Sequence, residues 1–155
     1  PARKRRPTVK TQPVVCPREA RPWQRAALVG VDPLVSQPDL LAQAVAIARA
    51  EHLALHVVAV ATDATRRPLA EAAAAAAVHE ARRQGVTAQG EARTGRPHEQ
   101  LIAAARDRGC ELLVIARHGP QNLSRAWIGG VAQKVIGLAE CPVWIHVPAA
   151  ARSAP

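Results

Sequence analysis

The segment IARHGPQNLSRAWIGGVAQKV, residues 115–135, carries the most informative pattern of this chain. An apolar run ends at Ala116, a loop containing Gly119 follows, and the pair Gly129 and Gly130 begins a second apolar segment. A strand that passes through a glycine-containing loop into a helix presents free backbone N–H groups at the helix start, and these groups bind phosphate. The segment therefore predicts the shape of a phosphate-binding loop, and the question is whether its residues still hold a phosphate.

Short apolar runs alternate with longer helical segments on the N-terminal side of this loop as well. Apolar runs predict strands at residues 26–32, 53–61, 111–116 and 141–148, and weak alternation predicts an edge strand at residues 86–93. Helices are predicted at residues 38–50, 68–84, 97–109 and 130–138, with prolines near several starts and Gly85 and Gly109 at two ends. This alternation predicts an open, doubly wound, parallel five-stranded sheet between two helical layers, a Rossmann-like α/β fold.

In an open parallel sheet, the ligand lies beyond the carboxyl ends of the strands, where the strand order reverses. The two strand ends concerned are Asp32, after the first predicted strand, and the loop after Ala116. We therefore expect Asp32 and the glycine loop to lie beside the same cleft.

The basic charge is concentrated at the N-terminus. Residues 1–25 contain eight basic residues and one acidic residue, or +7 of the formal net charge of +9, and five prolines lie in residues 1–22. We predict a disordered arm at residues 1–25, one folded domain at residues 26–148 and a frayed tail at residues 149–155. Residues 1–22 either contact nucleic acid weakly through its phosphates or form a solvated leader.

No apolar run approaches the roughly 20 residues that span a bilayer, and no apolar segment follows the basic N-terminus as in a secretory signal. We therefore expect a soluble, cytoplasmic protein. The three cysteines, Cys16, Cys110 and Cys141, form no Cys-x-x-Cys pair and are expected to be free thiols. Cys141 is interpreted as a small buried apolar residue, with a redox role as the alternative. No metal site is expected from the six histidines.

Residues 26–148 resemble the universal stress protein family. The most specific part is the last third: the turn from Gly95 to Pro97, the strand ending in ARHG, the loop PQNLSRAWI, the Gly-Gly pair and the segment CPVWIHV. Nucleotide-binding members of that family carry Gly, two residues, Gly, nine residues, Gly, and then Ser or Thr. On this chain those four positions are Ala116, Gly119, Gly129 and Gly130, so two of the four are kept.

Both departures weaken a phosphate site. Ala116 adds a Cβ where the backbone would pass close to the ligand, and Gly130 offers an N–H group but no hydroxyl. Losing one hydrogen bond to a charged group costs about 1.5 to 3 kcal/mol, which weakens binding by roughly ten- to a hundredfold. Pro33, after Asp32, removes a further backbone donor.

The resemblance implies a homodimeric regulator of the stress response with a degenerate nucleotide motif. The alternative is a functional ATP or AMP binder whose site residues are Asp32, Ala116, Gly119, Gly129, Gly130 and Val131. Asp32 either faces the ribose or only caps the turn before the first helix, since Asp-Pro often begins a turn. A third alternative is a nucleic-acid-associated protein that acts through the arm. No catalytic residue is predicted, and slow ATP hydrolysis is the most activity expected.

The last strand suggests a second surface. The resemblance implies a homodimer that pairs this strand with its copy, through Pro142, Val143, Trp144, Ile145, His146 and Val147. His146 would then face solvent or the partner, while Trp144 either joins the interface or packs under a helix of its own domain. The segments DP, QPDL and CPVW also resemble the first half of tandem, E-type universal stress proteins.

Overall fold

The structure is a computed structural model that describes residues 25–117 and 128–148. Nearly all of the basic arm, the motif position Gly119 and the tail at residues 149–155 lie outside the described residues. What the sequence predicts for them stays a prediction.

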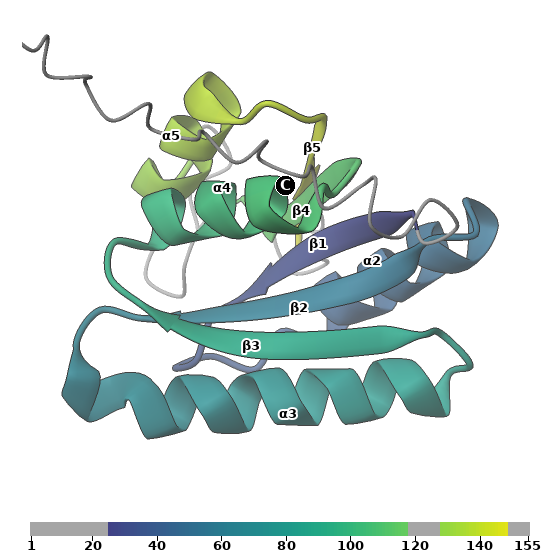
Figure 1. The fold of residues 1–155 in the computed structure, drawn as a ribbon, viewed down its shortest axis with the longest axis horizontal. Coiled ribbons are helices and arrows are strands. Elements are labelled where there is room, and N and C mark those ends of the chain that lie inside the picture. The colour runs from purple at the N-terminus through teal and green to yellow at the C-terminus, as the bar shows by residue number, and fades with distance from the viewer. Residues whose placement is uncertain (1–24, 118–127, 149–155) are drawn as a thin grey trace, which may run out of the picture.

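Five strands form one parallel sheet, which confirms the doubly wound α/β fold class. They are β1 (Ala26–Val31), β2 (Ala54–Ala61), β3 (Ala88–Thr94), β4 (Leu112–Ala116) and β5 (Val143–His146). Their order is β3-β2-β1-β4-β5, and every neighbouring pair is parallel (Figure 1). β3 is an edge strand, as its weak alternation predicts, and β5 forms the other edge.

Helices cover both faces of the sheet (Figure 1). They are α2 (Pro38–Ala50), α3 (Arg67–Arg83), α4 (Pro97–Arg108) and α5 (Gly130–Leu138), with a 3-10 turn, η1 (Ala64–Arg66), before α3. Buried residues of α2 and α3 form one core cluster with the sheet, and those of α4 and α5 form the second cluster on the opposite face.

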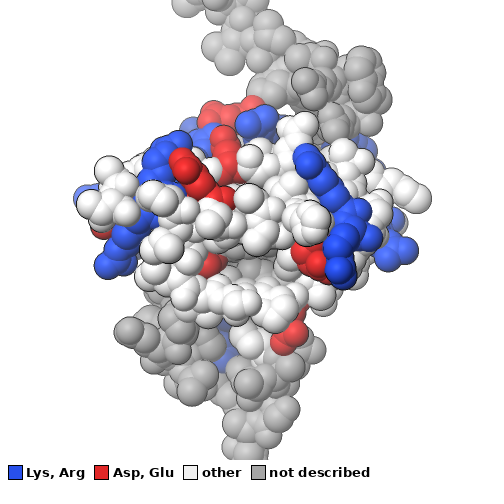
Figure 2. Space-filling view, turned by 90° about the horizontal axis from the view of Figure 1, so that it is seen from below, with Lys and Arg blue, Asp and Glu red and all other residues white. Residues whose placement is uncertain are grey.

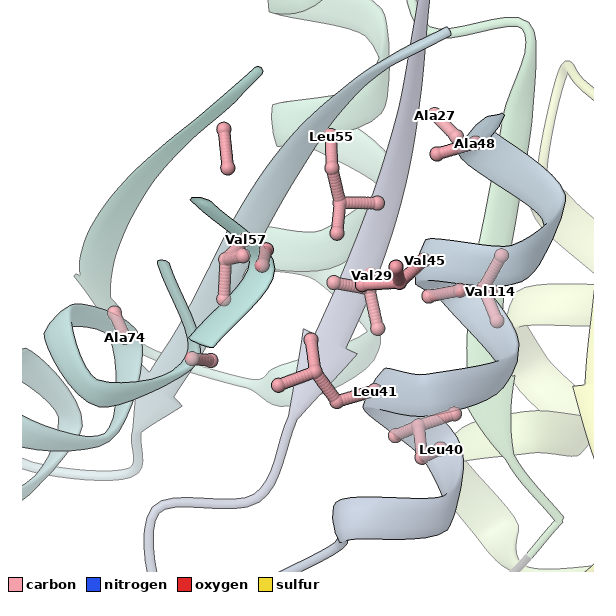
Figure 3. Close-up of a cluster of buried hydrophobic side chains, with 14 of the residues drawn as sticks. Ala27, Val29, Leu40, Leu41, Val45, Ala48, Leu55, Val57, Ala74 and Val114 are labelled. Atoms are coloured by element: carbon pink, nitrogen blue, oxygen red, sulfur yellow. The ribbon is translucent and has the colours of Figure 1, made fainter. Parts of the chain in front are cut away.

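The central strands are apolar because both of their faces are covered. Leu55 and Val57 of β2 belong to the cluster under α2 and α3, whereas Val58 belongs to the cluster under α4 and α5. Figure 3 shows Leu41 and Val45 of α2 directed toward the strands of the first cluster. These layers fix which strand ends meet at the same edge of the sheet.

Two glycines end helices as predicted. Gly85, at φ 80°, and Gly109, at φ 59°, both adopt the left-handed conformation that glycine tolerates best. After Gly109, the N–H of Cys110 donates to the carbonyl of Ala105 at 2.9 Å, which closes the end of α4. This turn places Cys110 directly before β4.

Helix α3 lies close to the sheet because its buried side chains are short. They are Ala70, Ala74, Ala77 and Ala81. A Cβ added at Gly90 of β3 would lie 2.7 Å from Val78 Cγ2, so a side chain at this strand position would have to displace Val78. Figure 2 shows the outer surface on this side, where charged side chains gather toward both ends and the middle is uncharged.

The last strand is shorter than predicted, and the burial of three residues in or before it differs from what was expected. β5 spans Val143–His146 instead of residues 141–148. Trp144 is 46% exposed, so it does not pack under a helix of its own domain, and His146 is only 5% exposed, so it does not face solvent. Cys141 is half-buried rather than buried. Trp144 and His146 are two residues apart and lie on the same face of β5, so the cover over that face differs between the two positions.

A buried histidine pairs with an acid on the edge strand, which the sequence analysis did not predict. His56 of β2 is 5% exposed, and its Nε2 lies 3.2 Å from Glu91 Oε1 on β3. Arg93 donates to the same oxygen at 3.0 Å and reaches Asp107 of α4 at 2.9 Å. Burial lowers the pKa of His56, against the opposing hydrogen bond with Glu91.

The lowered pKa of His56 should make the stability of the protein depend on pH, and replacing His56 with glutamine, which does not titrate, tests this. The unfolded chain protonates His56 near its ordinary pKa of 6.5, and the folded protein does so only at lower pH. The unfolded state therefore binds more protons, and stability falls as the pH drops through that range. We expect the wild type to lose more free energy of unfolding than His56→Gln between about pH 7.5 and 5.5 in urea denaturation.

The matched control is His79→Gln on the exposed surface of α3, for which we expect the wild-type pH profile. Parallel profiles for His56→Gln and the wild type would contradict the inference that folding lowers the pKa of His56.

Candidate functional site

A cavity of about 650 Å³ lies at the carboxyl ends of β1, β2 and β4. The strand order reverses between β1 and β4, which is where an open parallel sheet forms its ligand crevice. The lining consists of residues 30–34, 60–62, 115–117 and 129–132, with Gln37, Arg66, Pro97 and Leu101. The chain diverges here because α2 follows β1 on one face and α5 follows β4 on the other.

The structure brings five of the six predicted site residues to this cavity. Asp32, Ala116, Gly129, Gly130 and Val131 all contribute to its lining. Gly119 lies outside the described residues. The residues on the two predicted strand ends, 84 positions apart from Asp32 to Ala116, therefore share one cavity wall.

The carboxylate of Asp32 already caps a turn. Its Oδ1 accepts the N–H of Leu34 at 2.8 Å, and its own N–H donates to Gln37 Oε1 at 3.2 Å. These bonds hold the turn between β1 and α2 in place, as an Asp-Pro turn predicts. Asp32 is only half-buried and lines the cavity, so the turn role and a ligand role involve the same side chain.

The start of α5 offers fewer donors than the sequence predicts. The N–H of Gly129 donates to the carbonyl of Arg117 at 2.8 Å, which joins the two ends of the loop and withdraws this donor from an anion. Helix geometry leaves the next three N–H groups, of Gly130, Val131 and Ala132, without an intrahelical acceptor. All three residues line the cavity.

Gly130 is not required by packing. A Cβ added there meets no atom within 4 Å, and its φ is not in the left-handed range. The position is the first residue of α5 and is exposed. A serine would therefore fit at Gly130 without strain and would bring a hydroxyl to the cavity.

Several residues that line the cavity were not predicted from the sequence. Thr62 follows β2 as Asp32 follows β1, and because the strands are parallel, this position was a usable signal. Arg66, in the 3-10 turn after β2, lines the cavity and lies 3.6 Å from Asp63. Gln37 and Pro97 were not singled out either.

The cavity combines an apolar wall with a few polar groups. The apolar side chains include Val31, Val60, Leu101 and Ile115. Among the described residues, the charged side chains in the lining are one carboxylate, Asp32, and two guanidinium groups, Arg66 and Arg117. Such a lining suits a ligand with a flat, weakly polar part and an anionic end. The described part of the chain contains no group of three or more His, Cys, Asp and Glu residues that could hold a metal ion.

Among the described residues, no helix is both long enough and apolar enough to cross a membrane.

Comparison with known sequences matches residues 25–148 to the model of the universal stress protein family. The chain is 33% identical over 51 residues to universal stress protein MJ0577 of Methanocaldococcus jannaschii. The aligned segment covers 33% of this chain and 32% of that relative, so it spans about a third of the relative's length.

Solved structures show the same fold. A universal stress protein in complex with cAMP has a TM-score of 0.66 and 21% identity, over 80% of this chain and 97% of that chain. The universal stress protein of Archaeoglobus fulgidus in complex with dAMP gives 0.63 and 20%, over 78% and 96%. A putative universal stress protein of Pseudomonas aeruginosa gives 0.65 and 24%, over 84% of this chain but 46% of that one.

The family match runs from the residue before β1 to the residues after β5, and so includes every strand of the sheet and both walls of the cavity. This chain belongs to the universal stress protein family.

Proposed function

We propose that this chain is a stress-response regulatory module whose cavity binds an adenine nucleotide weakly. The observation that carries the proposal is Gly130, which begins α5 at the cavity wall without a hydroxyl and with open space where one would lie. Two structures of similar fold, the complexes with cAMP and with dAMP, support an adenine mononucleotide as the ligand class.

The size and lining of the cavity support a ligand of this class. A volume of about 650 Å³ falls within the range of small-molecule sites, roughly 300 to 1,000 Å³. In this proposal the apolar wall accommodates the base. The oxygens of Asp32 and Thr62, at the strand ends, accept hydrogen bonds from the ribose hydroxyl groups, and the N–H groups in the first turn of α5 bind the phosphate.

The donors at the phosphate end are the reason for weak binding. The missing hydroxyl at Gly130 removes one hydrogen bond to a charged oxygen, worth about 1.5 to 3 kcal/mol. The N–H of Gly129 is already donated to Arg117 at 2.8 Å. Together they reduce affinity by at least roughly ten- to a hundredfold relative to a site with a hydroxyl at position 130.

The alternative is an ATP- or AMP-binding protein of ordinary affinity that uses the loop with Gly119, Gly129 and Gly130. The two proposals are separated by denaturing the purified full-length protein and measuring released adenine nucleotide by mass spectrometry. Calorimetric titration with ATP, AMP and cAMP follows. We expect little retained nucleotide and weak binding. Retained nucleotide in near-stoichiometric amount would establish the alternative.

Restoring the motif should strengthen binding. We expect Ala116→Gly with Gly130→Ser to raise nucleotide affinity by roughly ten- to a hundredfold, because the hydroxyl adds a hydrogen bond to a charged oxygen. The control is Gly137→Ser on the same helix, where a Cβ also meets no atom within 4 Å and the residue does not line the cavity. If the double variant and the wild type bind nucleotide with equal affinity, then Pro33 or the path of the loop, and not positions 116 and 130, limits the affinity.

Two variants separate the turn role of Asp32 from its proposed ligand role. Asp32→Asn keeps an oxygen for the Leu34 N–H, whereas Asp32→Ala removes it and should cost about 1 kcal/mol of stability. If the carboxylate also bonds the ribose, both variants weaken nucleotide binding in calorimetry. Binding that is unchanged in Asp32→Asn would leave Asp32 with the turn role alone.

The same regulatory module is proposed to form a homodimer through β5. This strand is the sheet edge, and Trp144 exposes 46% of its surface there. An exposed large aromatic side chain on an edge strand is typical of a pairing surface. His146 is buried in its own domain, so the interface would use Trp144 and the strand backbone.

Introducing a charge at Trp144 should therefore produce a monomer. We expect Trp144→Lys to halve the mass measured by analytical ultracentrifugation while leaving the circular dichroism spectrum unchanged, because the charge cannot be buried unpaired. Leu69→Lys, at a 50% exposed position of α3, is the control and should stay dimeric. A wild-type protein that is monomeric at all concentrations would exclude this dimer.

A further inference from the structure

Two free thiols lie at the starts of neighbouring parallel strands. Cys110 follows Gly109, which caps the end of α4, and lies two residues before β4, and Cys141 lies two residues before β5. Leu113 of β4 pairs with Val143 of β5, and the Leu113 N–H donates to the Pro142 carbonyl at 3.0 Å. If this register is extended backward, Cys141 lies opposite residue 111, the residue that follows Cys110 in the chain.

Both thiols also line one small cavity. A cavity of about 220 Å³ between the end of α4 and the end of α5 is lined by both cysteines, and both pack in the same core cluster. Neighbouring strands lie about 4.8 Å apart, and a disulfide requires Cα atoms about 4.4 to 6.8 Å apart. On two paired strands a one-residue offset would point the side chains to opposite faces, but Cys110 lies before β4, in the turn after α4, and both cysteines reach the same cluster.

The surroundings favour the neutral thiols. Burial raises the pKa of Cys110 to about 12, and the nearby Cys141 adds to this, whereas Arg108 opposes it. Burial also raises the pKa of Cys141, and the carboxylate of Glu140 contributes. Glu140 itself accepts two bonds from Arg106, at 2.7 and 3.3 Å, at the edge of the cavity. The pair is therefore slow to oxidise at neutral pH.

We propose that Cys110 and Cys141 form a reversible intramolecular disulfide, with a low-molecular-weight disulfide such as oxidised glutathione as the oxidant. The half-buried Cys141 thiolate attacks one sulfur of the oxidant, forming a mixed disulfide and releasing one thiolate. The Cys110 thiolate then attacks Cys141 Sγ and releases the second. Both cysteines are oxidised, the oxidant is reduced to two thiols, and these take up the two protons.

The position of the bridge gives it a consequence. The ring from Cys110 to Cys141 contains β4 and α5, and thus Ala116, Gly130 and the rest of that cavity wall. A disulfide stabilises by restricting the unfolded chain, and a loop of about 30 residues should raise the thermal midpoint by about 5 to 10 °C. We favour a disulfide over a metal ion bound by the two thiols, because the described residues supply no third ligand.

The test uses the full-length chain with Cys16→Ser, so that only the two proposed thiols remain. After incubation with oxidised glutathione, remaining thiols are alkylated and the protein is digested with trypsin. We expect a loss of about two mass units and one linked species that joins residues 109–117 to residues 135–152. Cys141 that carries glutathione permanently, with Cys110 still reduced, would overturn the proposal.

Three further readouts establish that the bridge forms within one folded chain. Oxidation of a mixture of isotope-labelled and unlabelled protein should give no mixed linked peptides; their presence would indicate a bridge between copies and overturn the proposal. The bridged form should melt at a higher temperature than the reduced form, and a lower midpoint would show that the fold does not accommodate the bond. Cys110→Ser should stop at the mixed disulfide.

The kinetics distinguish this pair from ordinary surface cysteines. Because both thiols are mostly protonated, the rate of bridging should rise about tenfold per pH unit and keep this slope above pH 9, where an ordinary thiol is already mostly ionised. Glu140→Gln should accelerate the first step severalfold, because it removes the carboxylate beside Cys141. Glu99→Gln, an exposed acid at the other end of α4, is the control. A rate that levels off near pH 9 would overturn the assignment.

Discussion

The pairing of β1 with β4 is the constraint on which the cavity depends. Leu28 lies opposite Leu113 and Val29 opposite Val114, and all four side chains are fully buried. These strands are neighbours in the sheet but distant in sequence, and the chain leaves them toward opposite faces. A crevice between their carboxyl ends is the necessary result, because no single connection can cover both. Asp32 and Gly130 both line the crevice because they follow these two strands in the chain.

Much of the fold could be predicted from the sequence because its signals are local. Apolar runs, the prolines near the helix starts, and the glycines at positions 85 and 109 each act within a few residues, and the structure confirms the elements that they predict. The ends of β5 were less predictable. Pro142 has no N–H to donate, and only its carbonyl bonds the sheet, by accepting the N–H of Leu113. The paired segment is therefore shorter than the apolar run.

Contacts between residues that are far apart in the sequence could not be predicted from it. His56 and Glu91 are 35 residues apart, and only the register between β2 and β3 brings their side chains to the same face. In the same way, motif spacing located Gly129 correctly at the cavity but did not show that its N–H is used by Arg117. A spacing rule specifies where a glycine lies along the chain. The partner of its N–H depends on the path of the loop, which the spacing does not specify.

Helix α5 connects the two regions for which we propose chemistry. Its first turn lines the larger cavity, and Ala139, which caps its end, lines the smaller one beside Cys141. Only Ala132 and Val135 of this helix are buried, whereas α2 buries five residues, so few buried side chains hold α5 in place. A ligand at one end and a covalent bond at the other would stabilise the same weakly packed element. By thermodynamic linkage any such coupling is reciprocal: if the bridge strengthens ligand binding, the ligand favours the bridge to the same extent.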